Sequence, residues 1–345
     1  MAQPALTFPR PVFAKLSPHP FLLRCLTPKS SSDSETETSS RTNGRAPREA
    51  RSVHIHTSSL THANGSAVVR TGNTTVICGI RAEVLPVSQI PQYRPRAAFE
   101  EETEVSKKAE LKNYDLVVPN IELATGCAPQ FLPGVPPTAL AQTLSSRLYS
   151  LLVGSGMVQV EDLRIWKKGR EGKKVEEGEM DVDVEEDGDE EEEDLLGYWV
   201  LYVDLLFVSF DGNPFDAAWT AAVAALRDTK LPVARWDADR EAVVCSREMK
   251  QLGVKGLPVA CSAAVFLEKE YGEPGEGKHW ILLDPDRLEE TLCREVVTMV
   301  VDCSGGETRI RAIEKQGGTL ISRELIRGFV GVAEQRWKEV SKAMK

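Results

Sequence analysis

The order of apolar and polar residues in the first part of the chain predicts β-strands. Period-two alternation is clear over 51–57 and 66–84, and an Asn-Gly pair within 62–66 and a Gly-Asn pair at 72–73 provide turns. A further strand is expected over 114–123. One face of the second strand segment carries Val76, Cys78, Ile80, Ala82 and Val84. The segments up to residue 84 therefore predict a meander.

Helical spacing follows between 136 and 156. The leucines that share one face of this predicted helix are Leu140, Leu144, Leu148, Leu151 and Leu152. Pro136 and Pro137 stand at its start and Gly154 stands just past its end, which is the usual asymmetry of helix termini. Residues 91–112, in contrast, are polar and contain proline, so they predict a loop.

Two more strands and an alanine-rich helix complete the first part of the chain, and the order of strands followed by a helix then starts again. Strand segments at 158–166 and 198–210 lead into an alanine-rich helix over 217–226. Further strands are expected at 259–268, 279–284, 294–303 and 308–316. The C-terminal helix that follows has an apolar stripe of Ile321, Leu325, Phe329, Val332 and Val340. The pattern as a whole predicts an α+β protein.

Composition divides the chain into three parts. Residues 1–40 are rich in proline and serine and are expected to be mostly disordered, although the apolar segment 18–26 could dock as a helical turn. A first half at 41–230 and a second half at 231–345 account for the strands and helices. At 345 residues the chain is long enough for a substantial core in either one large domain or two.

The net charge of −10 is misleading, because the acidic residues are concentrated in one segment. Residues 176–194 contain 14 acidic side chains and no basic one, so the rest of the chain carries +4. Such a body permits contact with nucleic acid but does not argue strongly for it. The acidic run lies between two predicted strands, so 168–194 is interpreted as an insertion in a loop of the first half. A solvated insertion is preferred over a segment that recruits a basic partner or shields the surface.

The seven cysteines are scattered, with no Cys-x-x-Cys pair, which indicates reduced, buried thiols and argues against a zinc site. The longest apolar run, 195–210, has 16 residues and contains Asp204, so no membrane span is predicted. The first 32 residues lack acids, as organelle presequences do. Five prolines among the first 20 residues disfavour the amphipathic helix that import requires.

The segment "SFDGNPFDAAWTAA" at 209–222 joins an apolar strand to the alanine-rich helix through a tight turn. A helix start of this kind presents free backbone N–H groups and the positive end of the helix dipole, and proteins use it to hold phosphate. The turn contains Asn213, Pro214 and Phe215, however, and no lysine or arginine that could meet an anion. The residues alone leave open whether the turn is a phosphate site or the remains of one.

Three segments in the first part of the chain form one pattern: "RTNGR" at 41–45, "REAR" at 48–51 and "GSAVVRTGNTTVICGIRAEV" at 65–84. They resemble the RNase PH superfamily, because the third is similar to the opening hairpin of that family and the first two are similar to the segment before it. The family pattern continues at 205–226 and 282–292. The segment that begins "VVPNIELATGC" at Val117 resembles the non-catalytic subunits of the eukaryotic RNA exosome ring. The resemblance extends over about 41–340, in order.

The resemblance implies a fold of two βαβ-type halves packed as an α/β sandwich, the fold of the second domain of ribosomal protein S5. It also implies assembly with related subunits into a six-membered ring around an RNA channel, with three RNA-binding cap subunits above. Family members of this kind work in the nucleus, the nucleolus and the cytoplasm. No cofactor and no membrane contact are expected.

The resemblance also assigns a role to the turn after the strand at 198–210. Active members carry Asp-Gly-Gly-Thr-Arg there, and this chain carries Asp211, Gly212, Asn213, Pro214 and Phe215. A phenyl ring offers neither the charge nor the paired hydrogen bonds of an arginine, and proline removes a backbone donor. The turn is therefore interpreted as a relic of a phosphate site.

The family's acidic positions lead to the same interpretation. Two aspartates six residues apart in active members fall here on Glu290 and Val296, and valine cannot bind a metal. Asp284, Asp286 and Glu289 lie nearby and are interpreted as residues that cap a turn and a helix. No catalytic residue and no metal site are expected.

Other candidates have less support. Arg94 and Arg96 could face the ring channel and contact RNA phosphates, although exposed loop charges are the preferred interpretation. His54 and His56 share one face of a strand, but a third metal ligand is lacking, so solvent-facing histidines are preferred.

The sequence thus supports the hypothesis of a catalytically silent ring subunit that takes part in 3′–5′ RNA processing through its interfaces, in ribosomal RNA maturation and mRNA turnover. The alternatives are an active phosphate-dependent 3′–5′ exoribonuclease and a free RNA-binding module.

Overall fold

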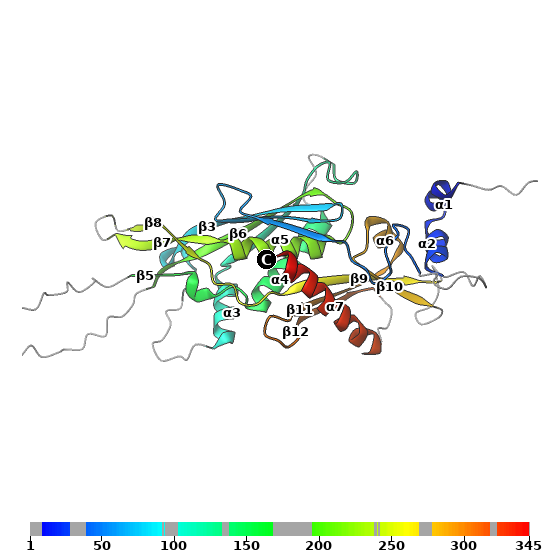
Figure 1. The fold of residues 1–345 in the computed structure, drawn as a ribbon. Coiled ribbons are helices and arrows are strands. Elements are labelled where there is room, and N and C mark those ends of the chain that lie inside the picture. Colours follow the sequence, from blue (N-terminus) through cyan, green and yellow to red (C-terminus); the bar gives the residue numbers. More distant parts are fainter. Residues whose placement is uncertain are drawn as a thin grey trace, which may run out of the picture.

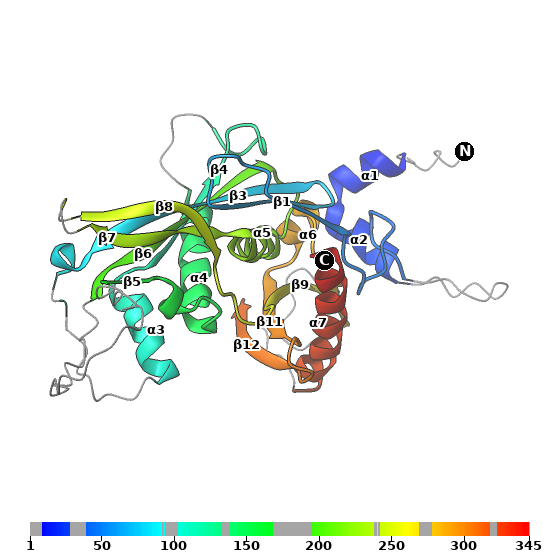
Figure 2. The same ribbon diagram turned by 60° about the vertical axis from the view of Figure 1, so that its left-hand side comes forward.

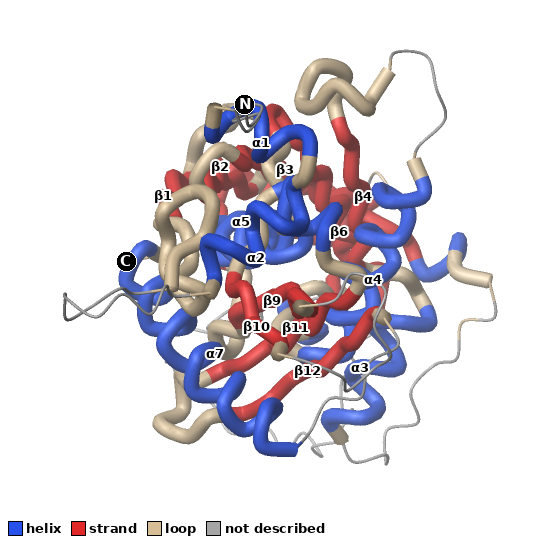
Figure 3. The backbone as a smooth tube through the Cα atoms, turned by 90° about the vertical axis from the view of Figure 1, so that its right-hand side faces the viewer, coloured by secondary structure: helices blue, strands red, loops and turns tan. Residues whose placement is uncertain are grey.

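A computed structural model describes residues 9–27, 39–91, 93, 103–132, 138–167, 195–237, 240, 242–268, 278–317 and 323–344, without the side chains of 324 and 325. Two β-sheets lie one above the other with helices α4 (Ala139–Ser155) and α5 (Pro214–Asp228) between them (Figures 1 and 2). Helix α7 (Arg323–Ala343) runs along the outer side of the second sheet (Figure 3).

The first sheet has the order β1-β2-β3-β6-β4, and β5 pairs with the end of β6. Its strands are β1 (Val53–Thr57), β2 (Gly65–Thr71), β3 (Thr74–Pro86), β4 (Val117–Leu123), β5 (Arg164–Trp166) and β6 (Leu195–Ser209). All neighbours are antiparallel except β4 and β6, which are parallel and are connected through α4. The first half therefore contains a βαβ unit within its meander.

The second sheet has the order β10-β9-β11-β12. Its strands are β9 (Val259–Leu267), β10 (His279–Leu283), β11 (Glu295–Asp302) and β12 (Arg309–Gln316). Strands β10 and β11 are both antiparallel to β9, so they run parallel to each other, and α6 (Arg287–Leu292) connects them. This arrangement is a split βαβ unit, and the predicted fold class of two βαβ-type halves is confirmed.

Helix α5 is buried along almost its entire length because its small side chains let both sheets approach. Trp219 is fully buried and its indole N–H donates to the Pro258 carbonyl at 2.8 Å, which ties the helix to the loop before β9. On the other side, a Cβ at Gly65 would lie only 2.6 Å from the Ala225 carbonyl oxygen. Only glycine allows β2 to pack this closely against α5.

Several predicted elements differ from the structure. Part of the predicted loop 91–112 is helix α3 (Glu104–Asn113), which is capped by the Thr103 hydroxyl. The predicted strand 158–166 consists of a short 3₁₀ turn, η2 (Val160–Asp162), and β5, and another turn, η1 (Val87–Gln89), follows β3. The hairpin of β7 (Lys230–Asp237) and β8 (Ala242–Gln251) was not predicted (Figure 2).

Two predicted boundaries also change. Helix α4 continues through Gly154 and ends at Ser155, and its C-cap is Gly156, whose φ of +64° gives the left-handed conformation that favours glycine. The Asn-Gly pair at 64–65 does not form a two-residue turn, because the β1–β2 connection extends over 58–64. In the last helix Phe329 and Val340 are buried as predicted, and Val332 is half-buried, whereas Ile321 lies outside the described residues.

The N-terminal segment is more ordered in its described part than predicted. Helix α1 (Arg10–Leu16) buries no residue, but α2 (Pro18–Leu26) packs against the second sheet. Leu22 and Leu26 are fully buried in a cluster with Phe266 and Leu282. The segment 18–26 is therefore a docked helix of nine residues rather than a single turn.

The cysteines are free thiols, and four are buried: Cys78, Cys127, Cys261 and Cys293. Cys245 on β8 is exposed, contrary to the expectation of buried thiols, because β8 has solvent on both faces along most of its length. Strands β5 and β6 pair on either side of 168–194, a segment outside the described residues. Within the described part of the chain, no helix is both long enough and apolar enough to cross a membrane.

Candidate functional site

The turn between β6 and α5 has a backbone that only a few residues can adopt. Gly212 has φ +77° and Asn213, the N-cap of α5, has φ +49°. A Cβ at Gly212 would lie 2.5 Å from the backbone carbon of Asp286, at the start of α6, so this position requires glycine for space as well. The close packing places the end of β10 and the start of α6 directly against the turn.

Arg51 holds the turn from the first half of the chain. Its Nη1 donates to the Asp211 carbonyl at 2.7 Å, while its Nε and Nη2 donate to the two carboxylate oxygens of Asp284 at 2.8 and 2.7 Å. Burial alone would raise the pKa of Asp284, but the hydrogen bonds and charge of Arg51 lower it to about 2. Asp284 is therefore a carboxylate that fixes Arg51, and Arg51 fixes the turn.

The side chain of Asn213 connects two buried carboxylates. Its Nδ2 donates to Asp284 Oδ1 and to Asp216 Oδ2, both at 2.8 Å. Asp216 also accepts from the backbone N–H and the hydroxyl of Ser262 on β9, at 2.8 and 2.7 Å. Burial raises the pKa of Asp216 despite these donors. The turn, the second sheet and the start of α5 thus share one hydrogen-bond network.

The backbone N–H of Asn213 donates to Glu290 Oε1 at 2.7 Å. Glu290 belongs to α6, and burial raises its pKa to about 7, although the hydrogen bond from Asn213 opposes the rise. A carboxyl group of the chain itself therefore stands at the helix start where an external anion would have to bind.

The two residues that follow Asn213 offer nothing to an anion. Pro214 has no N–H, and Phe215 is buried, with 3% of its surface exposed. The guanidinium carbon of Arg147, on α4, lies 3.9 Å from the centre of the Phe215 ring. Arg147 also donates to Glu314 at 2.6 Å and to Thr298 at 3.3 Å, so its charge is paired inside the protein.

The segments that carry the family resemblance lie close together around the turn between β6 and α5. Arg41 lies fully buried beside Glu289, with its Nη1 3.2 Å from Oε2, and Arg45 lies 3.4 Å from Asp284. Asp286 caps α6 and forms a reciprocal capping box with Glu289, at 2.9 Å in both directions. The interpretation of Asp286 and Glu289 as helix-capping residues is confirmed, whereas Asp284 is an ion-pair partner of arginine.

Val296 takes no part in this network. It lies at the start of β11, between Ala264 of β9 and Gln316 of β12. The resemblance places Glu290 and Val296 at the positions of the two family aspartates. Of these two residues, only Glu290 makes a polar contact with the turn.

The remaining candidates lie elsewhere. His54 and His56 are exposed on β1, and the residues that the structure describes include no cluster of metal-ligating side chains. Arg94, Arg96 and the acidic run 176–194 lie outside the described residues. The role assigned to each of them stays a prediction.

The roles of Arg51 and Arg147 were not predicted from the sequence. Arg51 stands in the quoted "REAR" segment, so the resemblance could have indicated it, but its partner Asp284 is 233 residues away. Arg147 occurs on an ordinary amphipathic helix with no local signal.

Comparison with known proteins identifies the family to which these motifs belong. Residues 49–232 match the 3′ exoribonuclease family, domain 1, known as RNase PH. The exosome complex component rrp43 of Schizosaccharomyces pombe is 30% identical over 334 residues, which cover 96% of this chain and 97% of that protein. The chain belongs to the RNase PH family. The exosome complex component Rrp42 of Methanothermobacter thermautotrophicus is 27% identical over 86% of each chain.

Solved structures share the fold. A chain of the Archaeoglobus fulgidus exosome with RNA bound to the active site aligns with a TM-score of 0.59 at 23% identity, covering 89% of this chain and 93% of that chain. A chain of an archaeal exosome core aligns with a TM-score of 0.55 at 22% identity, covering 88% and 91%. The stacked sheets with α4 and α5 between them are therefore the RNase PH fold.

Proposed function

We propose that the protein is a non-catalytic ring subunit of the RNA exosome. The relatives named exosome components align with almost the entire chain, and the fold is that of exosome core chains. In this role the protein would support 3′–5′ RNA processing and degradation, including ribosomal RNA maturation and mRNA turnover, by shaping the RNA channel and binding its neighbours.

The observation that carries the non-catalytic assignment is the hydrogen bond from the Asn213 N–H to Glu290. Phosphorolysis needs inorganic phosphate at this helix start and a cation to neutralise it. Here a carboxyl group faces the donor, a proline follows, and Phe215 stands where the family pattern has arginine. Phosphate would have to displace Glu290 from the Asn213 N–H, so phosphate binding is disfavoured.

Partners of three kinds are proposed. Related RNase PH-like subunits would form the ring, RNA-binding subunits would cap it, and single-stranded RNA would pass through its channel. Each contact with a ring neighbour should bury more than about 1,000 Å². The proposed locations are the nucleus, the nucleolus and the cytoplasm, and fluorescence microscopy of the tagged chain would test them.

Two measurements test the proposal. A tagged chain purified from native extract should bring down RNase PH-like paralogues and RNA-binding subunits, identified by mass spectrometry; recovery as a lone stable monomer would contradict a ring subunit. The isolated chain, given a single-stranded oligoribonucleotide and phosphate, should release no nucleoside diphosphate. Phosphate-dependent release would support the active exoribonuclease, and tight RNA binding by the lone chain without release would support the free RNA-binding module.

A further inference from the structure

A cavity lies at the end of the second sheet where β11 ends and β12 begins. It has a volume of about 420 Å³ and is bounded by α3, the C-terminal end of α4, the loop before β9 and the turn between β11 and β12. Strand β11 begins at Glu295, just after α6, and ends at Asp302 in this cavity. Thr298 pairs with Ser262 of the candidate site and lies four residues before Asp302, so about 14 Å of β11 separates the two sites.

Four basic side chains line this cavity, and we call it the basic pocket. Lys108 comes from α3, Lys255 from the loop before β9, and Arg309 and Arg311 from β12. Because these elements are distant in the sequence, only the folded chain brings the four charges together.

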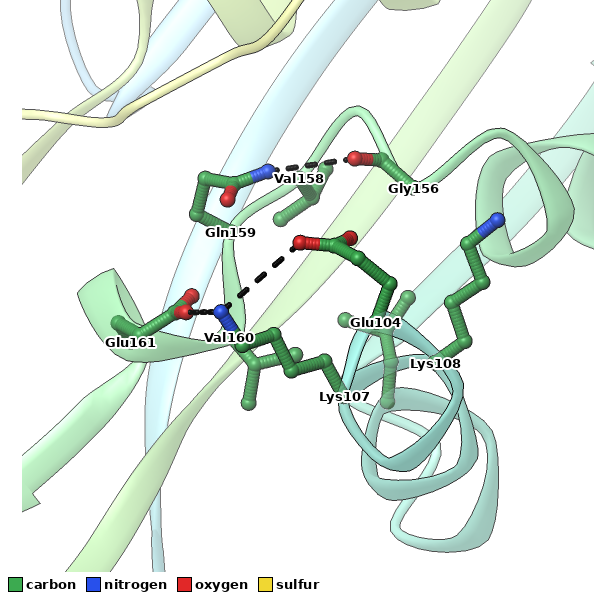
Figure 4. Close-up of a pocket in the computed structure, with 9 residues that line it drawn as sticks. Glu104, Lys107, Lys108, Gly156, Val158, Gln159, Val160 and Glu161 are labelled. Carbon is green, nitrogen blue, oxygen red and sulfur yellow. Dashed lines mark hydrogen bonds and ion pairs between the residues drawn. The ribbon is translucent and has the colours of Figure 1, made fainter. Parts of the chain in front are cut away.

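The two acidic residues of the basic pocket are already engaged. Asp302 Oδ1 accepts from the Leu257 N–H at 3.2 Å and from the Ser304 hydroxyl at 2.6 Å, and Oδ2 accepts from Arg311 at 3.2 Å. Glu104 lies 3.9 Å from Lys107. Figure 4 draws the adjoining pocket, which shares Glu104 and Lys108 with the basic pocket, and it shows that Lys107 extends to both Glu104 and Glu161, which form ion pairs with it.

The C-terminal end of helix α4, which carries the negative end of the helix dipole, also borders the basic pocket. Lys108 lies at this end, and its positive charge counters the dipole. In Figure 4 Lys108 extends away from the Lys107 ion pairs, and its Nζ donates to the Gly154 carbonyl at 2.8 Å. Lys255 and Arg309 are exposed and have no ion-pair partner among the described residues. These two cations therefore remain uncompensated.

We propose that the basic pocket binds the phosphodiester backbone of single-stranded RNA, an inference that rests on the proposed function. Its volume is within the roughly 300–1,000 Å³ in which proteins hold small organic molecules, so it has room for a nucleotide unit. Aromatic side chains, on which bases would stack, are absent from its described lining. Recognition would therefore be electrostatic and independent of base sequence.

The test uses the complex purified through the tagged full chain and a fluorescein-labelled single-stranded oligouridylate. The Lys255→Ala/Arg309→Ala variant should lower the affinity of the complex about tenfold and make the dependence of log K on log salt shallower by about 1.4, at about 0.7 for each lost phosphate contact with a single strand. The control variant Arg235→Ala/Arg240→Ala removes two charges that are 69% and 73% exposed on the β7–β8 hairpin, and it should change neither quantity. Lys255→Arg/Arg309→Lys keeps both charges and should retain the binding.

The outcomes separate this proposal from the proposed function. If the unaltered chain assembles into no ring, the proposed function fails. If the ring assembles and the Lys255→Ala/Arg309→Ala variant binds the oligonucleotide with unchanged affinity and salt dependence, the basic pocket does not bind RNA. If this variant falls out of the ring while the control variant stays, the pocket binds an acidic segment of a neighbouring subunit, and the RNA proposal is overturned.

Discussion

Glu290 accepts the backbone N–H of Asn213 at the start of α5, with 2.7 Å between Oε1 and the nitrogen. The contact joins the start of α5 to α6, so the two halves of the molecule meet at the place where active relatives would hold phosphate. Burial of this carboxyl raises its pKa to about 7. The stability of the turn therefore depends on whether Glu290 is ionised.

The first prediction concerns pH. The folded-state pKa of Glu290 is raised from 4.5 to about 7, so between these values the folded state binds a proton that the unfolded state releases. Stability is therefore lost as pH rises from about 4.5 through about 7, by roughly 2 kcal/mol after allowance for partial exposure. In the purified complex, hydrogen exchange of α5 should show this loss between about pH 5 and about pH 8, after correction for intrinsic exchange rates. Glu290→Gln should remove it, and an unchanged slope in that variant would contradict the assignment.

The second prediction concerns Asp284, the carboxylate that pairs with Arg51. Asp284→Asn leaves the guanidinium, only 10% exposed, with the Asp211 carboxylate at 3.8 Å as its remaining ion-pair partner, and should cost about 3 kcal/mol. Because the pKa of Asp284 is lowered from 3.8 to about 2, its contribution is present above about pH 4 and is lost as pH falls through about 2. The opening free energy of α5, again from hydrogen exchange, measures the cost.

A matched control is Glu83→Gln. It breaks an ion pair with Arg81 in which both side chains are more than half exposed, at 64% and 53%. Exposed pairs of this kind contribute about 0–1 kcal/mol. Equal costs for Asp284→Asn and Glu83→Gln would show that Asp284 does not hold the turn.

Much of the fold could be predicted because its signals are local. The alternation in β3 and the leucine spacing in α4 reflect which side chains are buried, and Leu144, Leu148 and Leu152 are indeed in the core. The elements that were missed lack such a pattern. Helix α3 buries only Leu111, and β8 exposes most residues on both faces, so neither segment shows an apolar period.

The site could be predicted only in part, for a similar reason. The resemblance identified the turn and Glu290, but the ion pair between Arg51 and Asp284 spans 233 residues and no pattern links the two positions. Likewise, nothing near Arg147 in the sequence indicates that it stacks on Phe215. Contacts between residues that are distant in the sequence depend on how the two sheets pack around α5.

A third prediction tests the stacking of Arg147 on Phe215. The cation lies 3.9 Å from the ring centre and is partly shielded from solvent, so the interaction should be worth about 0.5–2 kcal/mol. A double-mutant cycle with Arg147→Met and Phe215→Leu keeps most of the apolar volume while removing the charge and the ring. Hydrogen exchange of the first turns of α5 gives the coupling energy, and additive effects of the two substitutions would exclude the interaction.

The last prediction concerns the docking of helix α2. Leu22 is fully buried with Phe266 and Leu282, whereas Leu16 on α1 is 63% exposed. Leu22→Ala should therefore cost about 2–5 kcal/mol, since it removes buried apolar volume and leaves a cavity. The effect should be local, because few elements besides the second sheet contact α2.

Limited proteolysis of the complex measures this effect. Leu22→Ala should make the chain susceptible to cleavage within 10–26, and the midpoint of the main unfolding transition should change little. Leu16→Ala removes the same atoms from an exposed position and should leave the cleavage rate as it is in the unaltered chain. If both variants are cleaved at the unaltered rate, α2 is held by contacts other than the Leu22 side chain; if both are cleaved faster, α1 is packed as well.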